Sequence, residues 1–204
     1  NSQTLYEDKK GNYWRAFEFI EDSTSKIIAQ NSEQAKTTAK TFASFTASFA
    51  QFDLAALKVV IPEFHNLSHR YKQFEEALQQ NKAGRLDIAK EVRSMACSED
   101  ENCTEPDRIE IRPEFYDAIV SGYTEVMQQH LTKEEKAHIH YAGILMIYMQ
   151  ALRFITDYLN GDIYYRIQYP TQNFDRAVNQ LTLLQKLEDF LEDHYQFNAH
   201  DSLP

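Results

Sequence analysis

Apolar residues recur every three or four positions over most of the chain, which is the spacing of a helix that buries one face. In the first such stretch Asn31 or Ser32 can cap the helix, because a short polar side chain accepts a hydrogen bond from the first turn. The stretch carries an apolar stripe of alanines and phenylalanines: Ala35, Ala39, Phe42, Phe45, Phe49 and Phe52. We therefore expect a helix here whose phenylalanines belong to its apolar face.

Four later stretches have the same helical period. They predict helices from Asn66 or Ser68 to about Gly84, from Pro113 through Val126, from Thr132 to Asn160, and from Phe174 to about Tyr195. Thr132 and Glu135 have the spacing of a capping box, and Asn160 followed by Gly161 is typical of a helix end. Residues 86–112 are acidic and show the least pattern.

The first thirty residues follow a different pattern. Residues 13–20 alternate between two sets of largely apolar, aromatic-rich positions, as a β-strand does. A turn signal at Lys9–Asn12 separates this stretch from Thr4–Tyr6, so we expect a hairpin. The whole chain is thus predicted to be mostly α (α+β), with a small hairpin followed by five or six helices.

Composition and charge narrow the functional classes. The 5 glycines are isolated from one another, which excludes a P-loop and a GxGxxG dinucleotide turn in this chain. The formal net charge of −10 repels phosphate backbones and anionic lipid, so we expect no nucleic-acid partner and no membrane partner. No apolar run approaches the roughly 18 residues of a membrane span, and no signal peptide is visible, so we expect a cytoplasmic protein.

Histidine and cysteine spacing does not favour a metal site. His138 and His140 are two positions apart on a predicted helix and so point to nearly opposite sides. His65 and His69 have the spacing of one helix face, but the capping residues between them favour a helix start there. The two cysteines, Cys97 and Cys103, have no histidine nearby, and we expect free thiols in a reducing cytosol.

Arg153 lies in an apolar part of the predicted long helix and is open to two interpretations. It can form an ordinary helical ion pair with Asp157, four residues later. Alternatively, its guanidinium group can present N–H donors to the oxygens of a ligand in a concave surface, together with Tyr164 beyond the helix end. We expect the chain to double back at Gly161, which would bring both side chains to one polar cleft with an acid such as Asp157 restraining the guanidinium. These residues alone predict no reaction.

Several segments resemble a known family. NYWRAFEFIEDS at residues 12–23 is similar to the last N-lobe strand and hinge of the aminoglycoside phosphotransferase and choline kinase-like kinases, closest to the N-acetylhexosamine 1-kinase branch. The most specific similarity is LRFITDYLNGDIYY at residues 152–165. Further similar segments lie at residues 39–45, 61–66, 69–78 and 173–177, so the resemblance covers nearly all of the chain in order.

The resemblance implies a protein-kinase-like helical C-lobe over residues 23–204, with residues 1–22 as the N-lobe hairpin and hinge. It implies that the backbone of Phe17, Glu18, Phe19 and Ile20 contacts the adenine of ATP. The function implied is a sugar 1-kinase, which uses ATP and Mg²⁺ to phosphorylate the anomeric hydroxyl of an N-acetylhexosamine. The partners are then a small-molecule sugar and ATP, and the oligomeric state is left open.

In the same family Arg153 and Tyr164 would contact the acetamido sugar. The family's catalytic loop and metal motif have no counterpart here, and their place falls near residues 91–92, so we expect no catalytic residue and no metal ligand in this chain. We expect that the chain joins stretches of a longer protein, or that it is a deletion product, and that alone it does not phosphorylate sugar. The alternative is a catalytically dead kinase remnant that serves as a sugar-binding or protein-interaction module.

Overall fold

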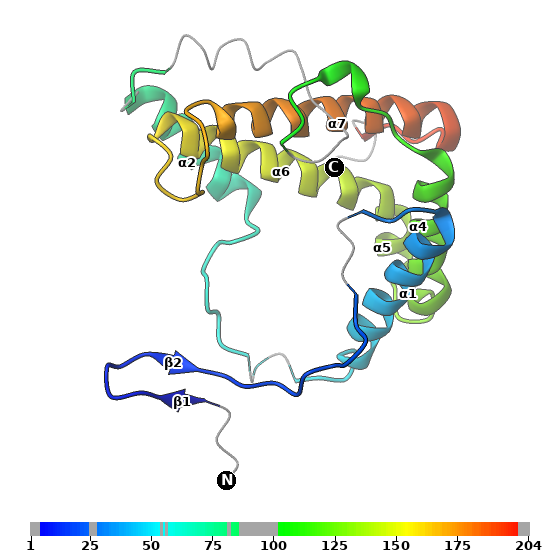
Figure 1. Ribbon diagram of the computed structural model, residues 1–204. Coiled ribbons are helices and arrows are strands. Elements are labelled where there is room, and N and C mark those ends of the chain that lie inside the picture. Colours follow the sequence, from blue (N-terminus) through cyan, green and yellow to red (C-terminus); the bar gives the residue numbers. More distant parts are fainter. Residues whose placement is uncertain are drawn as a thin grey trace. The chain divides into compact units, whose positions relative to one another are not determined.

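The computed structural model describes residues 5–24, 28–53, 55, 57–80, 83–85 and 102–199, and they are mostly helical with one two-stranded antiparallel sheet (Figure 1). The chain divides into two compact units, Asn1–Gln30 and Asn31–Pro204. The predicted junction near residues 91–92 lies outside the described residues. Within the described residues, none of the helices has the length and apolar character needed to cross a membrane.

The first unit contains the predicted hairpin. Strand β1 (Tyr6–Glu7) pairs with β2 (Tyr13–Trp14), with Tyr6 opposite Trp14. The carboxylate of Asp8 holds the turn by accepting hydrogen bonds from the backbone N–H of Asn12 at 3.0 Å and from Trp14 Nε1 at 2.9 Å. These bonds from Trp14 and Asn12 lower the pKa of Asp8 below its ordinary value.

The second strand is much shorter than predicted. Residues 15–20 have no regular structure, and Phe17 and Phe19 are 80% and 83% exposed. The alternation of these residues predicts a longer strand than the structure has, because the described partner strand β1 is only two residues long and a strand is not stable without a paired partner.

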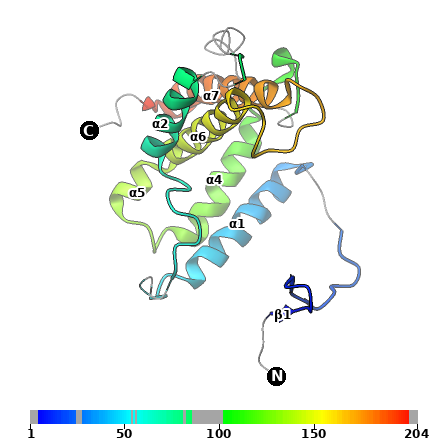
Figure 2. The same cartoon turned by 90° about the vertical axis from the view of Figure 1, so that its left-hand side faces the viewer.

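In the second unit, helix α1 (Ser32–Ser48) packs along α4 (Pro113–Met127), as Figure 2 shows. The predicted cap is confirmed, since Asn31 Oδ1 accepts from the N–H of Gln34 at 2.9 Å. The predicted apolar face is wrong: Phe42 and Phe45 are 66% and 63% exposed. Small residues face α4 instead, because the two backbones come so close that a Cβ at Gly122 would lie 2.5 Å from the carbonyl oxygen of Lys36.

Helices α6 (Ile139–Leu159) and α7 (Gln172–Tyr195) pack antiparallel and carry most of the described core (Figure 1). At one end Phe154, Tyr158 and Leu159 of α6 pack with Ala177 of α7, and helix α2 (Leu67–Gln80) adds Ala77. At the other end a second apolar cluster joins the beginning of α6 to the end of α7, namely Ile144, Leu187, Phe190 and Leu191. Between α2 and α4, residues Pro106–Arg108 form a short 3-10 helix, η3.

The long helix predicted from Thr132 is interrupted. The capping box of Thr132 and Glu135 is confirmed, but it opens only the short helix α5 (Lys133–Ala137). His138 leaves the helical conformation, at φ −102° and ψ 13°, and α6 begins after it. The end of α5 is closed by both groups of this residue: the backbone N–H of His138 donates to the carbonyl oxygen of Glu134 at 3.1 Å, and its Nδ1 lies 2.7 Å from the same oxygen.

An aromatic cluster connects α4 to α6 and α7. The hydroxyl of Tyr116 lies 2.7 Å from His140 Nδ1, and its ring centroid lies 5.3 Å from that of Phe190. Tyr195, at the end of α7, donates a hydrogen bond to Asp117. Burial raises the pKa of Tyr116 to about 12 and lowers the pKa of His140, so the neutral forms of both groups are favoured at this junction.

Replacement of Gly122 tests the close approach of α1 and α4. In Gly122→Ala the new methyl group would collide with the backbone of Lys36, so we expect the free energy of unfolding to fall by about 1–3 kcal/mol. The matched control is Gly143→Ala in α6, whose Cβ would lie 3.8 Å from Leu187 Cδ2 and which should be neutral or stabilising by up to about 1 kcal/mol. Urea unfolding of both variants measures the difference. Equal stabilities would contradict the packing of these two helices.

Candidate functional site

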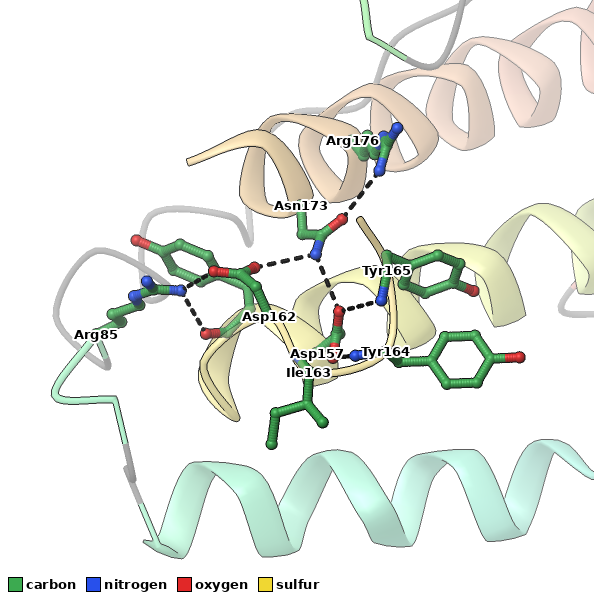
Figure 3. A network of polar contacts seen from close by, with 9 residues as sticks. Arg85, Asp157, Asp162, Ile163, Tyr164, Tyr165, Asn173 and Arg176 are labelled. Carbon is green, nitrogen blue, oxygen red and sulfur yellow. Dashed lines mark hydrogen bonds and ion pairs between the residues drawn. The ribbon is translucent and has the colours of Figure 1, made fainter. Parts of the chain in front are cut away.

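The end of α6 and the turn that follows it are organised around one buried carboxylate. Asp157 is 6% exposed, and its Oδ1 accepts the backbone N–H groups of Ile163 at 3.0 Å and Tyr164 at 2.8 Å. Its Oδ2 accepts the N–H of Tyr165 at 2.9 Å (Figure 3). Gly161, with φ +92°, permits the reversal of the chain that brings these three successive N–H groups to one side chain.

The side chain of Asn173 extends this network into α7. Asn173 is fully buried, and its Nδ2 donates to Asp157 Oδ2 and to Asp162 Oδ1, both at 3.0 Å. Its own oxygen accepts from Arg176 Nη1 at 3.2 Å. One amide group therefore donates to two carboxylates, and these hydrogen bonds join the start of α7 to the end of α6.

An ion pair closes the other side of the turn. Arg85 Nη1 lies 2.5 Å from Asp162 Oδ2 and also donates to the carbonyl oxygen of Tyr158 at 3.0 Å. The guanidinium carbon of Arg85 lies 4.5 Å from the centre of the Tyr158 ring. The side chain of Asp162 is 4% exposed, so this pair and the amide of Asn173 together satisfy a nearly buried charge.

A cavity of about 550 Å³ lies beside the turn, within the range of roughly 300–1,000 Å³ that is usual for small-molecule sites. Its lining comes from the segment before α2, from α2, from the end of α6 and from the turn. Arg153 and Tyr164 both line it, as the predicted reversal of the chain requires.

The surroundings of Arg153 are aromatic. Its guanidinium carbon lies 4.7 Å from the centre of the Phe64 ring, 5.4 Å from that of Tyr165 and 5.7 Å from that of Tyr164. Its Nη1 donates to Gln150 Oε1 at 3.1 Å. Such stacking holds a guanidinium group by cation–π attraction and leaves its edge for hydrogen bonds.

The expected restraint of Arg153 by Asp157 is wrong. Within the described part of the chain no carboxylate lies within 4.0 Å of the Arg153 guanidinium nitrogens. Asp157 is unsuitable as its partner because four N–H donors from the turn and Asn173 already occupy the carboxylate. The ordinary helical ion pair is therefore wrong as well.

Two residues of the site were missed by the sequence analysis. Phe64 contributes the ring closest to Arg153, and Arg70 of α2 donates through Nε and Nη2 to the carbonyl oxygen of Phe64 at 3.2 Å and 3.0 Å. The local signal for Phe64 is its position just before Asn66, which caps α2 by accepting from the N–H of His69. Helical periodicity could not reveal that this segment faces α6, about 90 residues later in the chain.

The predicted nucleotide contacts Phe17, Glu18, Phe19 and Ile20 lie in the first unit. Their side chains are exposed, and they belong to the segment without regular structure that follows β2. Their backbone groups take part in no strand pairing with the described residues, so the assignment of these residues to a nucleotide stays a prediction.

The described residues do not fit a metal ion. Among them, no group of three or more histidine, cysteine, aspartate or glutamate side chains could hold one. His65 lies before the start of α2 and His69 inside it, so the two do not share a helix face. The described residues thus offer no set of ligands for the Mg²⁺ that the kinase resemblance implies. A scan of the sequence against models of known protein families finds no match.

Replacement of Asp157 by asparagine tests whether the turn depends on this carboxylate. Asp157→Asn puts an NH₂ group against the N–H donors that one carboxylate oxygen now accepts, so we expect the free energy of unfolding to fall by at least about 2 kcal/mol. The control is Asp193→Asn on an exposed part of α7, which should stay within about 0.5 kcal/mol of the parent. Urea unfolding monitored by circular dichroism measures both. A loss for Asp157→Asn no larger than that of the control would contradict the role of this residue.

Proposed function

We propose that the chain is the helical part of an ATP-dependent sugar phosphotransferase, similar to the N-acetylhexosamine 1-kinases, and that the cavity between α2 and α6 binds the sugar. One observation carries the proposal: Arg153 and Tyr164, eleven residues apart, line the same cavity beside a turn held by Asp157. These are the two residues that the resemblance assigns to the sugar.

The chemistry of the cavity suits an N-acetylated sugar. The free edge of Arg153 supplies N–H donors for hydroxyl and amide oxygens, and the hydroxyl of Tyr164 can both donate and accept. The ring of Phe64 offers an apolar surface against which the C–H face of a sugar ring can lie. The bound sugar would thus be held from α6, the turn and the segment before α2.

The proposal separates binding from turnover. ATP would be contacted by the backbone of residues 17–20, and the general base and the Mg²⁺ ligands would come from aspartates of a segment that this chain does not contain. Phosphoryl transfer depends on those groups for positioning and charge neutralisation, so we expect the chain alone to bind sugar without phosphorylating it.

A second candidate is a catalytically inactive module that binds a protein. The exposed phenylalanines on α1 favour it, because Phe42, Phe45 and Phe49 form an apolar stripe that nothing in the described part of the second unit covers. Under this alternative the cavity beside Asp157 need not bind sugar, so sugar binding separates the two candidates.

Isothermal titration calorimetry with N-acetylglucosamine and N-acetylgalactosamine tests the sugar site. We expect binding of at least one sugar, and a loss of about 1.5–3 kcal/mol of binding free energy in Arg153→Ala, because a hydrogen bond to a charged group is removed. Arg166→Ala, at an exposed arginine outside the cavity, is the matched control and should leave the affinity unchanged.

Two results would contradict the proposal. One is the absence of binding for both sugars; the other is equal affinity in Arg153→Ala and the parent. Sugar phosphorylation by the chain alone would overturn the assignment of catalysis to another segment.

A further inference from the structure

The two arginines of the cavity have no carboxylate partner among the described residues, although the chain has 31 aspartates and glutamates and only 21 lysines and arginines. Arg70 and Arg153 are both half-buried, and neither has a carboxylate oxygen within 4.0 Å in the described residues. Arg85, on the other side of the same turn, differs from these two arginines because it forms an ion pair with Asp162. Positive charge at the cavity is therefore left without direct compensation from these residues.

The acids that line the cavity form no direct pair with either arginine. Asp157 keeps its negative charge, but its carboxylate accepts four hydrogen bonds from the turn and Asn173 and no hydrogen bond from a cavity arginine. Glu76, the other acid of the lining, is exposed to solvent on α2, where water screens its charge. His69 also lines the cavity and brings no negative charge to it.

The hydrogen-bonding capacity of the two arginines differs. Arg70 directs Nε and Nη2 to the carbonyl oxygen of Phe64 and Nη1 to Gln73, so it contributes mainly charge and the position of Phe64. Arg153 has five N–H donors, and one of them, on Nη1, donates to Gln150 Oε1. Aromatic rings at 4.7–5.7 Å surround the Arg153 guanidinium, so its edge is the part left for an acceptor.

A ligand that satisfies both the charge and the free edge is an oxyanion. A carboxylate or phosphate group accepts two parallel N–H bonds from a guanidinium edge, whereas a neutral hydroxyl group supplies an acceptor without the charge. The ring of Phe64 lies 4.7 Å from the guanidinium carbon of Arg153 and 5.7 Å from that of Arg70, so both positive charges act on the same region.

We propose that the cavity prefers a sugar that carries a carboxylate or phosphate group, bound at the edge of the Arg153 guanidinium with added attraction from Arg70. This inference rests on the proposed sugar site but specifies the charge of its ligand. The shared chemistry is an oxyanion on a sugar ring, whether the oxyanion is a carboxylate or a phosphate.

Calorimetric titrations of the 204-residue chain at low ionic strength test this preference. The acidic ligands are glucuronate and N-acetylglucosamine 6-phosphate, which is not the product of a 1-kinase, and the neutral ligands with matching rings are glucose and N-acetylglucosamine. We expect at least one acidic ligand to bind about tenfold or more tightly than its neutral counterpart, and the advantage to shrink as salt is added. Whichever acidic ligand shows it identifies the group as carboxylate or phosphate.

Variants of Arg153 test whether this residue causes the tighter binding of the acidic sugar. Arg153→Gln should abolish the difference in affinity between the acidic and the neutral ligand. Arg153→Lys keeps the charge but loses the planar fork, so it should keep only part of that difference. Arg166→Gln is the control outside the cavity and should leave the difference in affinity unchanged. Circular dichroism confirms that each variant is folded, and the comparison of ligands on the parent protein decides the question even where a variant does not fold.

The outcomes distinguish this inference from the proposed function. If N-acetylglucosamine binds through Arg153 and neither acidic sugar binds more tightly than its neutral counterpart, the inference is wrong and the sugar site stands. If acidic sugars bind through Arg153 and neutral sugars do not bind, the inference stands and the neutral N-acetylhexosamine is the wrong substrate. If no sugar binds, both are wrong.

Discussion

The carboxylate of Asp157 is the constraint on which the candidate site depends. It lies within the last turn of α6, away from solvent, and accepts the N–H groups of three successive residues beyond the helix end. A buried charge is costly unless it is hydrogen-bonded, and three backbone donors with the amide of Asn173 supply that compensation. The turn therefore has one well-defined course, and that course sets Tyr164 beside Arg153.

The site is built on the best-packed part of the described chain. Phe154, Tyr158 and Leu159 are at most 1% exposed, and they lie on the same two turns of α6 as Arg153 and Asp157. Helix α2 packs against this end of α6 and contributes another wall of the cavity. A rigid base of this kind holds binding groups in place before a ligand arrives, which lowers the entropy cost of binding.

Much of the local structure could be predicted from the sequence because caps and breakers act over a few residues. Asn31, the capping box at Thr132 and the helix end at Gly161 all lie where the sequence predicts them. The same helix end also predicts that Arg153 and Tyr164 line one cavity, because the chain reverses its direction between them. These features depend on backbone hydrogen bonds within one or two turns, which sequence patterns report directly.

The remaining features depend on contacts between distant segments. The phenylalanines of α1 are exposed because close packing against Gly122, far along the chain, selects the small face of the helix. The spacing of Arg153 and Asp157 predicts an ion pair, and the sequence near Asp157 does not indicate that the amide of Asn173, sixteen residues later, donates to its carboxylate. Phe64 and Arg70 reach Arg153 only through the packing of α2 on α6.

Amide hydrogen exchange at Ile163, Tyr164 and Tyr165 tests the central claim most directly, since their N–H groups donate to the Asp157 carboxylate. These residues lie outside any helix or strand, so ordinary turn amides in their place would exchange rapidly. The account predicts that all three exchange about as slowly as the amides in the last turn of α6. Exchange as fast as that of the exposed segment at residues 57–61 would contradict it, because the turn would then not be held by Asp157.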